Sequence, residues 1–301
     1  MQKRSRKHHY LPRHYLHGFT DNSGGFFVYD KKSGKIFYIS PDAAFFENDL
    51  NTVTIPGGDP SDSLEDLYTS IENQTWGSFD RIRASTVAGP IDIQDKLELF
   101  LFLSILHWRL PSNAAFAEKL SQDFFRPNTE LGFLKLESRT DAPVPQDIVD
   151  AIRRSEVWLK ASRLAVPFAP FYSASWFADV ATWRFLYPAD DKSWFLVGDN
   201  PIVTRGLDDH DPVNCLKDFI FPVSGRILLV SRGDRLAKVL PDDFVFHFGT
   251  AIIERASRFV ACHNKEFLEA LVSHHQLHVR SDKADCIIPE LFERLAPSDG
   301  A

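Results

Sequence analysis

The chain contains 301 residues, 44% of which are hydrophobic, and it carries a formal net charge of −7 at neutral pH. A chain of this size and hydrophobicity can bury a large core without disulfides or a structural metal, so we expect a compact globular protein. The net negative charge argues against a protein whose whole surface binds nucleic acid, although a local basic segment could still bind phosphates.

Residues 1–19 form a basic, histidine-rich arm at the start of this acidic chain. Five cations and four histidines precede the first acidic residue. A secretory signal would continue with an apolar stretch, whereas histidine, proline and glycine follow here. We expect the arm to hold phosphates by charge, and the alternative is a frayed, solvated chain end. The cations expected to bind substrate are Lys3, Arg4, Arg6, Lys7 and Arg13.

The arm is followed by a β-hairpin, and the two together make up residues 1–60. Residues 25–30 and 35–39 are rich in β-forming side chains and flank a Lys-Lys-Ser-Gly turn. Gly34 suits the last turn position, where a left-handed backbone is often required.

Residues 61–190 are predicted to be mainly helical. In the first helix, at 61–85, Ser61 or Ser63 is the expected N-cap and acidic residues fill the first turn. The run at 97–110 is the most apolar of the chain, but a bilayer span takes roughly 20 apolar residues, so we expect a buried helix and no membrane partner. Prolines bound the further helices, which are predicted at 91–110, 112–124, 145–162 and 173–186.

Residues 191–295 form a second region that is rich in β-structure and ends in helices. Strands are predicted at 194–197, 219–222, 226–231 and 259–261, and helices at 250–256 and 265–275. The fold class is therefore α+β, a single domain whose helical middle is flanked by two β-containing ends. These ends have to pair or pack with each other to protect their strand edges.

The sequence carries no signature of a cofactor or metal site. Phosphate-binding loops, dinucleotide fingerprints and nucleophile elbows are absent, so no cofactor is expected. The pairs His14 and His17, and His274 and His278, could each share a helix face, but they lack further ligands at suitable spacing, so no metal site is expected. Three cysteines without C-x-x-C spacing favour a reducing cytoplasm.

Four short motifs follow one another along the chain, at 7–19 (KHHYLPRHYLHGF), 106–111 (LHWRLP), 195–202 (FLVGDNPI) and 221–224 (FPVS). Together they resemble a bacterial family known as domain of unknown function 4238. That family has an H-x-x-P-x-x-Y-L-x-x-F block, an Arg-x-Pro at the end of a middle helix, and a Ser-Asp-Asn-Pro turn followed by a Pro-x-Ser-Pro segment. Here glycines stand where the family usually has the first Ser and often has the last Pro. The resemblance covers nearly the whole chain. It implies which positions are candidates for a functional site, and it implies no activity.

The positions that the resemblance implies include a set with catalytic capacity. It combines a base that titrates near neutral pH, two carboxylates, a fixed cation and an amide. The candidate catalytic residues are His9, Arg109, Asp199, Glu72 and Asn200, with Glu72 the least close match.

Each candidate also has a structural alternative. His9 is either a general base or an anchor of the arm. Arg109 lies where an apolar helix ends, so it either forms an ion pair with Glu72 or Asp199 or clamps a substrate phosphate or carboxylate. Asp199 and Asn200 are either turn-formers or site residues on a loop after a strand.

The leading hypothesis is a cytoplasmic hydrolase acting on a phosphate-bearing substrate such as RNA or DNA. His9 would move the proton, Arg109 would stabilise the developing negative charge, and Asp199 would hold the imidazole tautomer. The rival is a non-catalytic interaction module of a defence or toxin-linked system, in which the N-terminal block only closes the fold. Convergence of these three side chains on one open cavity would favour the enzyme. The expected partner is nucleic acid or a phosphate-bearing small molecule bound by the arm, and the oligomeric state stays open.

Overall fold

The computed structural model describes residues 6–54, 58–85, 91–123, 143–164, 166–172, 175–188, 190, 193–205, 215–231, 240–241 and 243–295. The helices in these ranges are α1 (Arg13–Leu16), α2 (Ser63–Ala84), α3 (Ile93–Arg109), α4 (Ala114–Asp123), α5 (Gln146–Arg154), α6 (Glu156–Ser162), α7 (Trp176–Ala181), α8 (Phe244–Arg255), α9 (Lys265–Arg280) and α10 (Ile287–Arg294). The strands are β1 (Lys7–His9), β2 (Phe26–Asp30), β3 (Lys35–Ile39), β4 (Phe46–Asn48), β5 (Val53–Thr54), β6 (Pro60–Ser61), β7 (Arg184–Leu186), β8 (Val197–Gly198), β9 (Val203–Thr204), β10 (Phe219–Ser224), β11 (Ile227–Ser231) and β12 (Phe259–Cys262). The α+β class is confirmed.

Two antiparallel sheets of four strands organise the described residues, in the orders β3-β2-β12-β8 and β7-β11-β10-β9. The predicted hairpin is present as β2 and β3, and Gly34 has a φ of +68° in its turn. Strand β12 pairs with β2, so that Val260 faces Tyr29 across the ladder. The β-containing ends of the chain therefore pair with each other, as their unprotected edges required.

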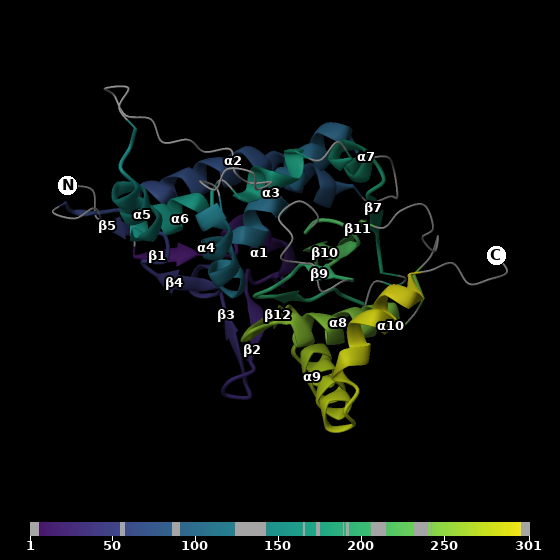
Figure 1. Cartoon of the computed structure of the whole chain (residues 1–301). Coiled ribbons are helices and arrows are strands. Elements are labelled where there is room, and N and C mark those ends of the chain that lie inside the picture. Colours follow the sequence, from purple (N-terminus) through teal and green to yellow (C-terminus); the bar gives the residue numbers. More distant parts are fainter. Residues whose placement is uncertain are drawn as a thin grey trace.

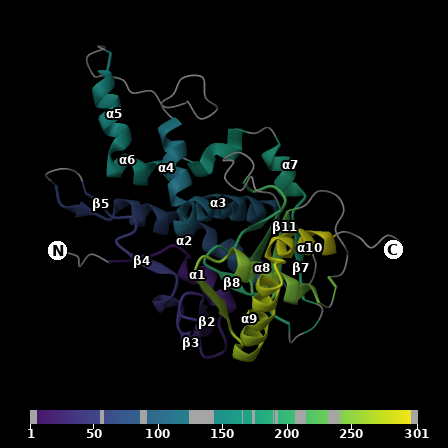
Figure 2. The same cartoon turned by 60° about the horizontal axis from the view of Figure 1, so that its bottom comes forward.

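The sheet of β7, β11, β10 and β9 is covered on both faces, because alternate side chains of its central strands enter different cores. Phe219, Phe221 and Leu229 pack in a core with α2 and α3. Ile220 and Val230 pack instead in a core with α8, α9 and α10. Figure 1 shows these two sets of helices on opposite sides of the sheet, and Figure 2 shows α4, α5 and α6 lying together beyond the α2–α3 pair.

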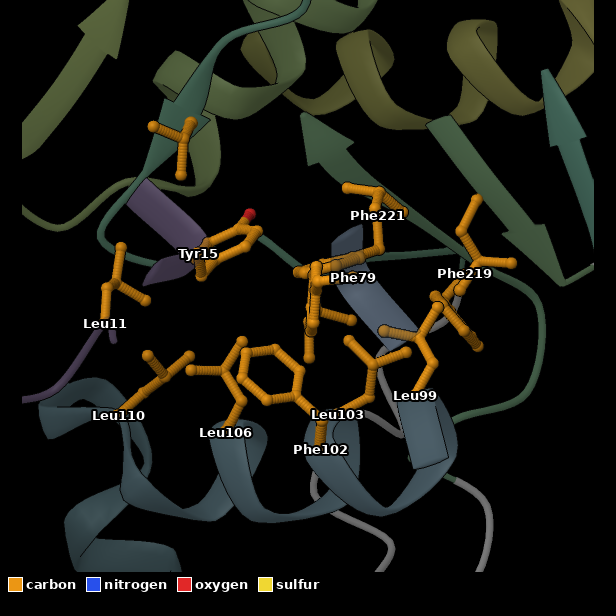
Figure 3. Close-up of a cluster of buried hydrophobic side chains, with 14 of the residues drawn as sticks. Leu11, Tyr15, Phe79, Leu99, Phe102, Leu103, Leu106, Leu110, Phe219 and Phe221 are labelled. Carbon is orange, nitrogen blue, oxygen red and sulfur yellow. The ribbon is translucent and has the colours of Figure 1, made fainter. Parts of the chain in front are cut away.

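The core under α2 and α3 also contains the N-terminal block. Tyr15 stacks on Phe221, with ring centroids 5.2 Å apart, and its hydroxyl donates a hydrogen bond of 2.8 Å to the Pro222 carbonyl. Phe79 of α2 and Phe102 of α3 close around the same ring (Figure 3). From β1 onward the described part of the arm is therefore a built-in element of the fold, and the expectation of a frayed end does not hold for it.

The helical region departs from its prediction at three places. Asp62 stands at the N-cap of α2, where Ser61 or Ser63 was expected. The helix predicted at 145–162 breaks at Ser155, whose Oγ accepts a hydrogen bond from the Trp158 amide and caps α6. The helix predicted at 173–186 ends with α7, and Phe185 pairs with Leu229 as part of β7. Pairing with a distant strand outweighed local helix propensity here, because sheet hydrogen bonds and burial depend on neighbours that the local pattern does not contain.

The C-terminal part follows its prediction with shifted bounds. Only Val197 of the strand predicted at 194–197 lies in a strand, β8. The helix predicted at 250–256 begins earlier, at Phe244. Helix α9 starts after Asn264, whose side chain accepts a hydrogen bond of 2.8 Å from the Phe267 amide. Within the described residues, none of the helices combines the length and hydrophobicity that a membrane crossing needs.

Candidate active site

A cavity of about 550 Å³ opens beside β1, α1 and α2. It brings together segments that are far apart in the sequence, since the end of α3 contributes to its lining. Four carboxylates, three cations and two histidines face it, together with three further side chains. The lining residues are Lys7, His9, Arg13, His14, Asp42, Glu65, Asp66, Thr69, Glu72, Asn73, Trp76 and Arg109.

Strand alternation explains which residues of β1 reach the cavity. In β1, which pairs antiparallel with β4, Lys7 and His9 share one face, whereas His8 is on the other face and is buried. The His8 ring accepts a hydrogen bond of 3.0 Å at Nδ1 from the Asn51 amide. The arm thus uses alternate residues for structure and for the cavity wall.

Helix α2 supplies most of the opposite wall from one of its faces. Glu65, Thr69, Glu72 and Trp76 follow one another at spacings of four, three and four residues, which places them along one side of a helix. The buried stripe of α2 runs next to this side and carries Phe79 and Ile82, which pack in the core with α3. The cavity therefore lies beside the apolar stripe of an amphipathic helix.

Arg109 closes the inner end of the cavity as the centre of a buried ion-pair triad. Its side chain is only 3% exposed, and it donates through Nη1 to Glu72 Oε1 and through Nη2 to Glu65 Oε2, the latter at 3.4 Å. The guanidinium also lies 4.6 Å from the centre of the Tyr68 ring. The residue ends α3 because its neighbour Leu110 leaves the helical conformation before Pro111.

Burial and the triad act in opposite directions on the titration of Glu72. Burial raises the pKa of the Glu72 carboxyl, and Arg109 lowers it only in part, so the pKa stays above its usual value of 4.5. For Arg109, burial lowers the pKa, but the charges of Glu72 and Glu65 outweigh it and leave the pKa raised. The cavity thus holds a carboxyl group whose pKa is shifted toward neutrality beside a permanently charged guanidinium.

The surroundings of His9 favour its neutral form. Burial lowers the pKa of the ring, and Arg13 and Arg109 lower it further, against a hydrogen bond to the backbone of Asp42. Nε2 is fully covered and has no hydrogen-bond partner among the described residues, so Nδ1 makes the bond to Asp42. The ring packs 5.6 Å from the Phe46 ring. His9 therefore lines the cavity with Nε2 covered by neighbouring atoms and with Nδ1 bonded to the backbone of Asp42.

The outer wall carries exposed charges. Arg13 Nη1 lies 3.0 Å from Asp42 Oδ1, and both side chains are well exposed. Lys7 Nζ lies 4.7 Å from the centre of the Phe46 ring. Arg6 pairs with Asp49 at 2.9 Å and does not line the cavity. The two other cations predicted to bind substrate, Lys3 and Arg4, lie outside the described residues.

Asp199 and Asn200 do not line the cavity. The Asp199 carboxylate accepts hydrogen bonds from three consecutive backbone amides, those of residues 257, 258 and 259, at 2.7 to 2.9 Å. Asp199 also donates its own amide to the Phe259 carbonyl at 2.9 Å, next to the pairing of Gly198 with Val260. These contacts tie the turn after β8 to the start of β12. The Asp199 carboxylate therefore stabilises this turn and does not hold the tautomer of His9. The backbone of Asp42 makes the hydrogen bond to the His9 ring instead.

Several cavity residues were not among the sequence candidates. They are His14, Asp42, Glu65, Asp66, Thr69, Asn73 and Trp76. Most of them lie on α2, and the helical spacing of Glu65, Thr69 and Trp76 with the candidate Glu72 was a signal that could have grouped them. Within the described residues, no group of three or more His, Cys, Asp or Glu side chains is arranged to hold a metal ion.

Residues 7–266 match the family model described as "Protein of unknown function (DUF4238)". The match spans far more than half of the chain, so the chain belongs to this family. A comparison with curated proteins gave no match, and a comparison with solved structures gave none either. The resemblance of the four motifs is thus confirmed, and the chemistry has to be inferred from the cavity.

Proposed function

We propose that the cavity is the active site of a hydrolase that acts on a phosphate-bearing substrate such as RNA or DNA. The observation that carries the proposal is Glu72, a carboxyl group with a raised pKa that is held by a buried guanidinium at the wall of a cavity. Catalytic bases and acids need a pKa near the working pH, and burial next to a fixed charge is a common way to obtain it. In this role the Glu72 carboxylate accepts a proton from the attacking water.

Arg109 and Glu65 act through Glu72 in this proposal. Arg109 is buried against both carboxylates, so it fixes the position of Glu72 and counteracts part of the rise that burial causes in its pKa. A fixed carboxylate needs no reorganisation when the proton moves, which is the benefit of a preorganised site. Arg109 is therefore a positioning residue, in place of the phosphate clamp that its position in the sequence also allowed.

The substrate phosphate is proposed to bind at the outer wall, where Lys7 and Arg13 are exposed. Both cations belong to the N-terminal block, in line with the expected role of the arm. His9 lines the cavity with them and is proposed to shape this wall, since its Nε2 is covered. All three cysteines are free thiols, which suits the reducing cytoplasm in which we propose the protein acts.

The experiment is a turnover assay on single-stranded RNA, single-stranded DNA and a chromogenic phosphodiester, with purified wild type, Glu72→Gln and the control Glu47→Gln. Glu47 is an exposed carboxylate of β4 that does not line the cavity. Loss of a general base lowers the rate by about 10²- to 10⁴-fold. We expect this loss in Glu72→Gln alone. Equal turnover in the two variants would contradict Glu72 as the base, and no turnover by the wild type would favour the non-catalytic interaction module.

A further inference from the structure

Trp76 presents an open aromatic surface inside the cavity. Its side chain is 47% exposed, although it lines a cavity and lies on a helix whose other face is in the core. One side of the indole is covered by His14, whose ring lies 5.3 Å away and nearly parallel, at 17°. His14 in turn packs edge-on against Phe79 and Phe102 of the core. The indole is therefore fixed from behind and open in front.

The His14 ring that is stacked on Trp76 carries no charge at neutral pH. Burial lowers the pKa of His14 to about 4, with Arg83 and His17 adding to the effect. A neutral ring stacked on an indole makes a flat, rigid platform of the kind on which nucleic acid bases stack. Asn73 precedes Trp76 by three residues on the same helix and also lines the cavity, so the cavity offers an amide that can hydrogen-bond to a base edge.

The charges around the cavity favour one type of transition state over another. Four carboxylates face it against three cations, and the buried triad alone combines two carboxylates with one guanidinium. Negative charge develops on the transferred group when a phosphodiester is cleaved, whereas positive charge develops on the sugar when a glycosidic bond is cleaved. The inner wall suits the second case, because carboxylates stabilise an oxocarbenium-like sugar.

We infer that the substrate is a nucleotide and that the bond cleaved is the N-glycosidic bond between its base and its sugar. The inference rests on the proposed hydrolase function and names its substrate and bond. The base stacks on Trp76, the phosphate contacts the outer wall at Lys7 and Arg13, and the sugar lies between them, opposite Glu72. An aromatic ring, a carboxylate and two cations that line one cavity supply a contact for each of the three parts of a nucleotide.

The reaction consumes one water and needs no other reactant. The C1′–N bond breaks and its electron pair leaves with the base nitrogen, while a water oxygen forms the new bond to C1′. Glu72 accepts one proton from that water. A cationic base such as a pyridinium leaves as a neutral molecule, so the proton is released to solvent. A neutral base has to gain a proton as it leaves, and the Glu72 carboxylic acid formed in the same step returns it.

The test is product analysis with three probes, nicotinamide adenine dinucleotide, adenosine monophosphate and a single-stranded RNA. Release of free nicotinamide or adenine by the wild type supports the inference. Strand scission or phosphate release without free base overturns the inference and leaves the proposed hydrolase standing. Absence of any product from all three probes overturns both. The Glu72→Gln variant has to lose the release of base while its circular dichroism spectrum matches the wild type.

A second measurement isolates the platform. Stacking of a base on an aromatic side chain corresponds to about a 5- to 150-fold effect on Kd. Trp76→Ala should weaken binding of the dinucleotide by this factor, and Trp76→Phe should retain most of the affinity. Phe177→Ala is the control, since Phe177 is equally exposed but lies on α7 outside the cavity lining. Unchanged affinity in Trp76→Ala, or equal losses in Trp76→Ala and Phe177→Ala, would contradict stacking in the cavity.

Discussion

Replacement of Arg109 by Met tests whether the buried triad holds the cavity together. Methionine keeps much of the length of the side chain and removes its charge, so Glu72 and Glu65 lose their common partner. Removal of one partner from a buried ion pair costs about 3–5 kcal/mol, because a buried charge is left uncompensated. Arg109 is 3% exposed and contacts two carboxylates, which places it in this class of pair. We expect Arg109→Met to lower the free energy of unfolding by about that amount.

The assay is urea denaturation followed by circular dichroism at neutral pH. Glu72→Gln added to Arg109→Met should recover part of the loss, because the double variant buries one fewer unpaired carboxylate. The loss in Arg109→Met should also shrink as the pH falls. Without Arg109 the folded pKa of Glu72 rises further above its unfolded value, so the penalty is present above the folded pKa and disappears once the carboxyl is protonated.

Arg6→Met provides the control for this experiment, since the pair of Arg6 with Asp49 is exposed and should contribute little. A loss below about 1 kcal/mol in Arg109→Met would refute the reasoning, because it would place the guanidinium outside a low-dielectric triad. A loss that does not depend on pH would refute the assignment of the penalty to the carboxylates.

Three further predictions concern residues outside the triad. Asp199→Asn should lower the free energy of unfolding in urea by about 1.5–3 kcal/mol and leave turnover intact, because the carboxylate accepts hydrogen bonds from three amides of a turn. A loss of turnover at unchanged stability would contradict this role. Stability should fall from about pH 6.5 to pH 4 by roughly 3 kcal/mol from His14 alone, since the unfolded ring gains its proton first, and His14→Phe should remove this part of the titration. His9→Gln should cost about 0.5–1.5 kcal/mol and keep most of the turnover, because Nε2 is covered, whereas a 10²-fold loss of turnover would restore His9 as the base.

The sequence predicted individual strands and turns better than it predicted which strands pair. Short apolar runs rich in β-forming residues at 219–222 and 226–231 predicted strands, and the turn glycine at 34 predicted a hairpin, because these signals lie within a few residues. The pairing of β7 with β11 could not be read from the sequence, since Arg184–Leu186 has no pattern that separates it from the end of a helix. Its conformation is set by the neighbour strand.

The site was predicted in part for the same reason. Lys7, His9, Glu72 and Arg109 were candidates and line one cavity, because chemical type and motif position marked them. Asp199 was also a candidate and lies in a turn, which a motif alone cannot distinguish from a site. Trp76 was missed, because an aromatic residue on an amphipathic helix is usually part of the core, and only its exposure shows otherwise.

The pH dependence of kcat/KM tests the role of Glu72 most directly, because it reports the ionisation of groups in the free protein that are needed for turnover. It is measured on whichever probe the wild type turns over. We predict that kcat/KM rises with pH through an apparent pKa above 4.5, because burial raises the pKa of Glu72 above this usual value. The residual activity of Glu72→Gln should lack this rise. A rise through an apparent pKa at or below 4.5, or an unchanged rise in Glu72→Gln, would contradict Glu72 as the group that accepts the proton.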